Sequence, residues 1–353
     1  MRNETKSYVK YHIKKSLKPF LFMLTVALIV TLVLCSQNRA VENFYGDHRP
    51  PTVRYYLKFN IPSIIAAVVT YMQVALQLTV FKKRRNLDCY YTMPVSRRTL
   101  GTVHYLTGLV STLLVYTASL VLNLILFIPS VLKHSPDLSI GFILLYYFST
   151  VLIICATYSF LAFAFDRGNT AGDGRWLMAL YTFLPGITSG AIIEVVVRGF
   201  ADKSYYGNGS GILPMFFYNI SATFEDLVLS RSISDEESVE LVVWFVGWCI
   251  LGAAAAIGFV YLFGKQPTQK TEEQSDSPFA FKILIPAYVI LGMLNFNYME
   301  VIAVIIIGVL AVIGYVVYRR GFHIKKVDLF VLIISLLIGI IAVTVLNELP
   351  KTN

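Results

Sequence analysis

The stretch IPSIIAAVVTYMQVALQLTVF KKRRNLDCYYTMPVSRRTLGTVHY, residues 61–105, decides how this chain folds. Its first part, residues 61–81, is apolar, and a helix of about 20 apolar residues crosses the hydrocarbon core of a bilayer. Its second part, residues 82–105, is polar and carries six lysines and arginines. A short basic segment between two apolar runs is typical of a loop on the cytoplasmic side of a membrane protein.

Apolar runs like residues 61–81 recur along the whole chain of 353 residues. Hydrophobic residues make up 56% of the chain and charged residues only 14%, whereas soluble domains carry about 25% charged residues. We therefore predict an all-α, polytopic helical membrane protein with about nine transmembrane helices. The predicted spans are residues 19–35, 61–81, 105–131, 139–165, 177–197, 240–264, 280–296, 300–318 and 328–346.

Residues 1–18 are predicted to form an amphipathic helix with a basic face. Lys6, Lys10, Lys14 and Lys18 recur every four residues beside an apolar stripe. The helix either lies in the membrane interface with its lysines toward anionic headgroups, or it is a basic flank that orients the first span. Both interpretations place the N-terminus in the cytoplasm.

The distribution of positive charge predicts the orientation of the spans. With nine crossings and the N-terminus inside, the cytoplasmic segments hold 21 of the 30 lysines and arginines, as the positive-inside rule expects. The C-terminus is then external. The weakest span is 280–296, which contains Lys282 and Pro286. If that segment lies flat in the membrane, the number of crossings is even.

These features divide the chain into four parts. Residues 1–18 are the cytoplasmic N-terminal helix, and residues 19–264 form a unit of six spans. Residues 265–279 are expected to be a cytoplasmic linker, because they combine proline with charged and amide side chains. Residues 280–353 form a membrane tail of three spans.

Two places within the six-span unit carry unusual residues. The outer loop 198–239 has an apolar and aromatic middle, residues 212–220. This middle either dips back into the membrane or packs on the spans, or else it contacts a partner or packs on itself. The fifth span is interrupted by Pro185, Gly186 and Gly190. These three residues form either a hinge, because proline frees a backbone carbonyl, or a place where small residues let helices pack closely.

The chain carries no pattern for catalysis or for metal binding. It has no glycine-rich phosphate loop and no metalloprotease or hydrolase motif, and its four cysteines match no metal or redox spacing. The formal net charge of +9 does not indicate nucleic acid binding, because the cations lie between spans and form no basic domain. We predict that the chain is not an enzyme and holds no metal or cofactor.

The spans also hold almost no carboxylates, which argues against a carrier driven by ions. Transport by this chain would therefore need an energy source in another chain.

The core of that loop, Met93-Pro94-Val95-Ser96-Arg97-Arg98, resembles the loop between spans two and three of ABC-2-type permeases, the membrane subunits of bacterial ATP-binding cassette transporters. The layout is also similar, with a basic N-terminal helix, six spans and a large outer loop before the sixth span. The resemblance covers roughly residues 1–264. The three-span tail departs from the minimal pattern of the family.

The resemblance implies an exporter of drug, peptide or lipid-like cargo in the bacterial cell membrane. It implies a separate ATPase subunit, which binds ATP and magnesium, and a second permease that is an identical or a sister chain. The loop between spans two and three would dock on the ATPase as a coupling helix. The residues predicted for this role are Asp88, Tyr90, Tyr91, Met93, Pro94, Ser96, Arg97 and Arg98.

The residue types of this loop suit such a joint. Pro94 disfavours helix in the residue before it, and Ser96 can cap a helix that begins at Arg97. Tyr90 and Met93 offer apolar anchors of the kind enriched at interfaces. In the other interpretation, the cations only orient the spans and Pro94 only forms a turn.

A second function remains open at this stage. The chain could be a membrane sensor or scaffold that transports nothing and binds an external ligand through the loop 198–239. The two functions differ in one partner, because only the permease needs an ATPase subunit.

Overall fold

The computed structural model describes most of the chain. The described residues are 2–35, 40–43, 52–55, 60–83, 90, 92–132, 140–200, 235–265, 273, 277–295, 301–319, 321–322 and 324–348. The loop 198–239 therefore lies mostly outside them, and so does most of the predicted linker 265–279.

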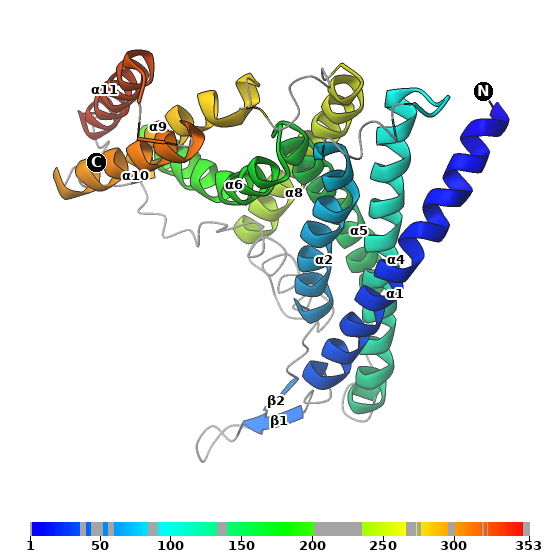
Figure 1. The fold of residues 1–353 in the computed structure, drawn as a ribbon. Coiled ribbons are helices and arrows are strands. Elements are labelled where there is room, and N and C mark those ends of the chain that lie inside the picture. The colour runs from blue at the N-terminus through cyan, green and yellow to red at the C-terminus, as the bar shows by residue number, and fades with distance from the viewer. Residues whose placement is uncertain are drawn as a thin grey trace. The chain divides into compact units, whose positions relative to one another are not determined.

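Helices make up nearly all of the described residues, as the sequence predicted (Figure 1). One small antiparallel pair of strands, which the sequence analysis did not predict, joins β1 to β2 with Ala40 opposite Tyr55. The elements in order are α1 (Arg2–Cys35), β1 (Ala40–Asn43), β2 (Thr52–Tyr55), α2 (Asn60–Thr79), η1 (Val80–Lys82), α4 (Arg97–Leu132), α5 (Ile140–Asp166), α6 (Ala171–Phe200), α8 (Asp235–Phe263), η3 (Pro278–Lys282), α9 (Ile283–Asn295), α10 (Val301–Arg319) and α11 (Lys326–Glu348).

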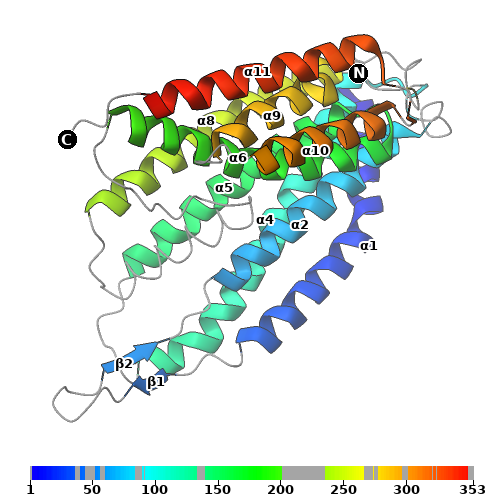
Figure 2. The same ribbon diagram turned by 90° about the vertical axis from the view of Figure 1, so that its left-hand side faces the viewer.

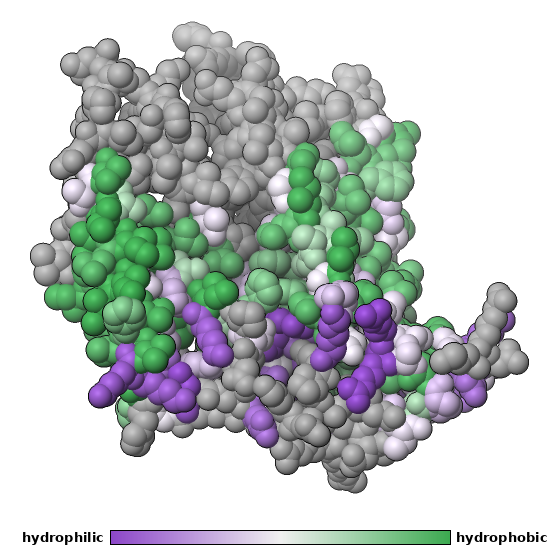
Figure 3. All heavy atoms as spheres, turned by 90° about the horizontal axis from the view of Figure 1, so that it is seen from above, coloured by the Kyte–Doolittle hydropathy of each residue, from purple (hydrophilic) through white to green (hydrophobic). Residues whose placement is uncertain are grey.

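The surface of the helices is apolar, as a membrane requires. On α2 the exposed row is Ile64, Val68, Met72 and Leu76, four residues apart, while polar Gln73 is buried. A soluble protein hides its apolar side chains instead. Figure 3 shows the same feature as wide green areas of apolar side chains on the described surface. The chain is thus a helical protein embedded in a membrane.

Among the described residues, six helices are long and apolar enough to cross a membrane. They are Glu4–Cys35, Ile61–Lys82, Arg97–Leu126, Ile143–Asp166, Phe245–Phe263 and Lys326–Val345. Two shorter apolar helices, Phe279–Leu294 and Val304–Arg319, correspond to the predicted spans 280–296 and 300–318. The structure therefore confirms helical spans, and the full count of nine stays a prediction.

The described helices group into two compact units. The first contains α1, α2, α4, α8 and the part of α5 that ends at Phe163. Within it, α4 packs along α1 and α2 and also contacts α8 (Figure 1). Apolar side chains of α1 and α2 meet Val115 of α4 in a buried cluster. Hydrogen bonds such as Tyr105 to Ser159 and Trp248 to Thr157 join the helices across the interior, as polar groups do inside membranes.

The second unit contains the end of α5, α6 and the helices of the C-terminal part. Here α9 lies between α6, α10 and α11 and packs on all three (Figure 2). The hydroxyl of Tyr181 on α6 donates to the carbonyl of Phe279 at 2.6 Å. The fifth predicted span thus packs with the tail 280–353, a partner that the sequence did not reveal.

Helix α1 is continuous from Arg2 to Cys35, although Pro19 lies inside it. The basic residues 1–18 and the first apolar span therefore form one element. Of the two interpretations of the basic segment, this continuity favours the flank of the first span.

Candidate functional site at the start of helix α4

Ser96 begins α4 in the way that the sequence predicted. The helix starts at Arg97, and the backbone N–H of Thr99 donates to Ser96 Oγ at 3.2 Å. The N–H of Leu100 donates to the carbonyl of Ser96 at 3.0 Å, which closes the first turn. A serine cap satisfies donors that have no partner inside the helix. The prediction that Ser96 caps a helix starting at the two arginines is confirmed.

The residues before the cap form a bend that projects outward. Pro94, Ser96, Arg97 and Arg98 are exposed, and Met93 is half-buried. The N–H of Val95 donates to the carbonyl of Met93 at 2.7 Å, so the chain turns tightly around Pro94. Residues 92–98 therefore present a compact, exposed elbow at the end of the longest helix.

The two arginines occupy positions that do not stabilise the helix. Arg97 and Arg98 are the first two residues of α4, where the helix dipole presents partial positive charge and favours anions. Cations there cost the helix a few tenths of a kcal/mol or more. Helix stability therefore does not account for their position, whereas the positive-inside rule places cations at the cytoplasmic ends of spans.

Arg98 also packs against the end of α8. Its guanidinium lies 6.0 Å from the centre of the Tyr261 ring. A Cβ atom on Gly264 would lie 2.5 Å from Arg98 Cγ, so only glycine leaves room for this stem. Lys265 contacts the same tyrosine ring at 3.7 Å. The exposed end of this unit thus combines the start of α4 with a basic end of α8.

Tyr90 has a different environment from the exposed anchor that the sequence suggested. Its side chain is only 6% exposed. Its ring packs edge-on against Phe81 and His104, with centroids at 5.6 and 5.9 Å. Lys15 of α1 donates to the Tyr90 hydroxyl at 3.1 Å. Tyr90 therefore ties the start of the elbow to α1, α4 and η1 in this structure.

A buried polar cluster lies next to Tyr90. The rings of His12 and His104 lie 3.7 Å apart, and both side chains are buried. His104 Nδ1 donates to the carbonyl of Gln77 at 3.0 Å, and its Nε2 shares a hydrogen bond of 2.8 Å with the hydroxyl of Tyr8. His12 Nε2 donates to Gln77 Oε1 at 3.1 Å. The two histidines thus join α1, α2 and α4.

In the second unit, Lys82 forms a buried ion pair that the sequence analysis missed. Its Nζ lies 2.9 Å from the carbonyl of Asp166 and 3.4 Å from Asp166 Oδ1. The two side chains are 4% and 1% exposed, and Arg167 also pairs with Asp166. In the sequence, Lys82 is one of the cations that the positive-inside rule counts on the cytoplasmic side. The only sequence signal for the pair was the rare carboxylate at the end of the fourth span.

The turn after Asp166 is closely packed. Thr170 caps α6, because its Oγ1 accepts the N–H of Asp173 at 3.0 Å. A Cβ on Gly168 would lie 2.4 Å from the backbone nitrogen of Gly174, so the two backbones touch. This turn holds Asp166 in a fixed position opposite Lys82.

Some predicted residues cannot be placed in this site. Asp88 and Tyr91 lie outside the described residues. Pro185, Gly186 and Gly190 lie within the helical range of α6, but their side chains are outside the described part. The hinge at these residues stays a prediction.

Metal chemistry finds no support in the described ranges. No group of three or more histidine, cysteine, aspartate or glutamate side chains there could hold a metal ion. The two buried histidines instead bond to tyrosine and glutamine side chains and to a backbone carbonyl.

Comparisons of the chain with protein-family models, with curated proteins and with solved structures find no match.

Proposed function

We propose that this chain is the membrane subunit of an ATP-driven exporter and that residues 92–98 dock on a separate ATPase. The observation that carries the proposal is the pair Arg97 and Arg98, exposed at the capped start of α4. Their charge opposes the helix dipole, so a function other than helix stability best explains them. An acidic groove on a partner would be electrostatically complementary to this exposed pair.

Helix α4 is suited to carry motion away from such a contact. It has 36 residues, which corresponds to a length of about 54 Å at a rise of 1.5 Å per residue. It packs along α1 and α2 and contacts α8. A push on the elbow at Pro94 would therefore move a rigid element that several spans share.

Tyr90 gives the elbow a second connection. Its hydroxyl is bonded to Lys15 of α1, and its ring packs on His104 of α4. Movement of the docked elbow would then reach two helices together. In this proposal Tyr90 transmits the motion, and the exposed arginines and Pro94 contact the ATPase.

The cargo would be drug, peptide or lipid-like, and a second permease chain would complete the transporter. The described helices expose broad apolar surface, which agrees with amphipathic cargo but equally with contact to lipid. The cargo class therefore rests on the resemblance of the elbow to ABC-2-type permeases.

Replacing Arg97 with glutamate tests the docking directly. The tagged chain is purified from its native membranes, and co-purified proteins are examined for a chain with a glycine-rich phosphate loop. We expect an ATPase with the unchanged chain and its loss with Arg97→Glu. Because glutamate suits a helix N-terminus, the unfolding temperature should stay the same or rise, which separates lost docking from lost folding.

Lys18→Glu is the matched control, since Lys18 is an exposed cation on α1 and undergoes the same charge reversal. It should retain the ATPase. Full retention of the ATPase by Arg97→Glu would contradict the docking site. Absence of any ATPase from the unchanged chain would favour a sensor or scaffold instead.

A further inference from the structure

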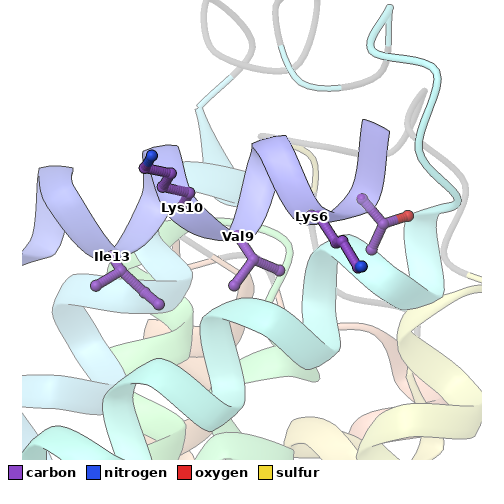
Figure 4. Close-up of a pocket in the computed structure, with 5 residues that line it drawn as sticks. Lys6, Val9, Lys10 and Ile13 are labelled. Atoms are coloured by element: carbon purple, nitrogen blue, oxygen red, sulfur yellow. The ribbon is translucent and has the colours of Figure 1, made fainter. Parts of the chain in front are cut away.

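The outer face of α1 carries a shallow hollow of about 340 Å³. The residues that line it are Thr5, Lys6, Val9, Lys10 and Ile13, all from this one helix. Figure 4 shows Lys6, Val9 and Ile13 in succession on one side of α1, while Lys10 extends toward the other side. The lining is largely apolar, and two lysines are among the residues that form it. A ligand that fits must therefore be apolar along its length and anionic at one end.

The hollow continues into an apolar stripe that runs toward the first membrane span. Ile13, Leu17 and Leu21 follow one another at intervals of four residues and are 52%, 47% and 49% exposed. Residues four apart lie on the same side of a helix. An acyl chain could lie along this stripe while its headgroup stays near Lys6 and Lys10.

The face of α1 that points away from the hollow is held by contacts with other helices. Tyr8 and His12 are buried and bond to His104 and Gln77. At 3.6 residues per turn, Tyr8 points about opposite to Lys6, and His12 points about 120° away from Lys6. Helix α1 is thus held in one rotation, and the two lysines and the apolar stripe face outward together.

We propose that this face of α1 binds one anionic phospholipid, with its phosphate between Lys6 and Lys10 and an acyl chain on Val9, Ile13 and Leu17. A lysine near a membrane surface attracts anionic lipid by about 1 kcal/mol. Burying the apolar side chains against an acyl chain adds to the affinity. The site is independent of whether the chain is a transporter.

The test uses the full chain in detergent micelles that contain either phosphatidylglycerol or phosphatidylcholine. Native mass spectrometry measures the lipid that the protein retains. We expect retention of phosphatidylglycerol over phosphatidylcholine, and an affinity about 30-fold weaker in the double variant Lys6→Ala/Lys10→Ala, since each of the two lysines contributes about fivefold. A photoactivatable phosphatidylglycerol should label the peptide that contains residues 5–17.

The control Lys14→Ala/Lys18→Ala removes two exposed lysines of the same helix that do not line the hollow. It should retain lipid like the unchanged chain. Equal loss in both variants would overturn the proposal, since it would show general attraction to a basic helix. Unchanged retention in the first variant, or equal competition by soluble glycerol phosphate, would also overturn it.

Discussion

At the scale of single residues, the structure separates charges that the sequence could not distinguish. Arg97 and Arg98 are exposed at a helix start, whereas Lys82 is buried against Asp166. All three belong to the same basic stretch. An exposed cation is accessible to a partner, while a buried one must be paired to stay charged. Only the first kind suits a docking surface.

The cap at Ser96 is expected to stabilise the start of α4. Ser96→Ala removes the acceptor of the Thr99 N–H and should cost about 1 kcal/mol, seen as a lower unfolding temperature in detergent. Ser96→Asp keeps an acceptor and should restore the stability. Thr102→Ala is the control, because the Thr102 hydroxyl only bonds to the carbonyl of Arg98 within the helix. An equal loss in Thr102→Ala would argue against the cap.

Mutations of Asp166 and of Lys82 should lower the stability of the protein by different amounts. Asp166→Asn leaves two buried cations, Lys82 and Arg167, without their carboxylate. Removing one partner of a buried pair costs about 3–5 kcal/mol. Lys82→Met should cost less, because Arg167 keeps its partner and the methionine is apolar. Thermal unfolding of both variants in detergent checks the order, and a larger loss for Lys82→Met would contradict it.

At the scale of elements, the helices carry their polar side chains on the buried face and their apolar side chains on the outer face. In a soluble helix bundle the arrangement is the reverse. The buried side of α2 carries Ser63, Thr70, Gln73 and Gln77, and its outer row is apolar. The Ser63 hydroxyl shares a bond of 2.6 Å with Tyr146 of α5. Because lipid offers no hydrogen bonds, polar side chains in a span turn toward other helices. This rule determines which face of each helix is inside.

Close packing between α5 and α8 depends on one glycine. A Cβ on Gly252 would lie 2.4 Å from both Cα and Cβ of Ala156, so Gly252→Ala should overpack the contact and cost about 1–3 kcal/mol. Gly247 of the same helix has open space around it. Gly247→Ala should be neutral or stabilise α8, since glycine weakens a helix by roughly 0.5–1 kcal/mol.

The unfolding temperatures of the two glycine variants provide the comparison. We expect a drop for Gly252→Ala and none for Gly247→Ala. Similar values for both would mean that α5 and α8 separate easily and that their contact contributes little.

At the scale of the whole molecule, the chain contains two units whose boundary does not follow the order of the spans. The predicted six-span unit 19–264 and tail 280–353 were separated at the polar linker 265–279. In the structure α6 packs with α9 and α11 of the C-terminal part. Contacts between spans distant in sequence leave no local pattern, so the linker alone was a poor guide to this grouping.

The orientation in the membrane is testable with single cysteines. In a chain whose four cysteines are replaced, we expect Lys18→Cys and Lys265→Cys to be labelled from the same, cytoplasmic side, because positive charge concentrates there. Labelling by a maleimide that cannot cross the membrane, in intact cells and in inverted vesicles, measures this. Opposite labelling of the two positions would require an odd number of crossings between them.

The sequence by itself determined the features that depend on near neighbours. Apolar runs with a length of about 20 residues predict spans. Ser96 predicted the start of α4, because a helix cap involves residues that are at most three positions apart. Only the tertiary structure decided which residues that are distant in sequence lie in contact. Lys82 and Asp166 are 84 positions apart, and Tyr90 meets Lys15 across 75. Such pairs form only when helices pack, because the low polarity of the interior makes a buried polar group costly unless it has a partner.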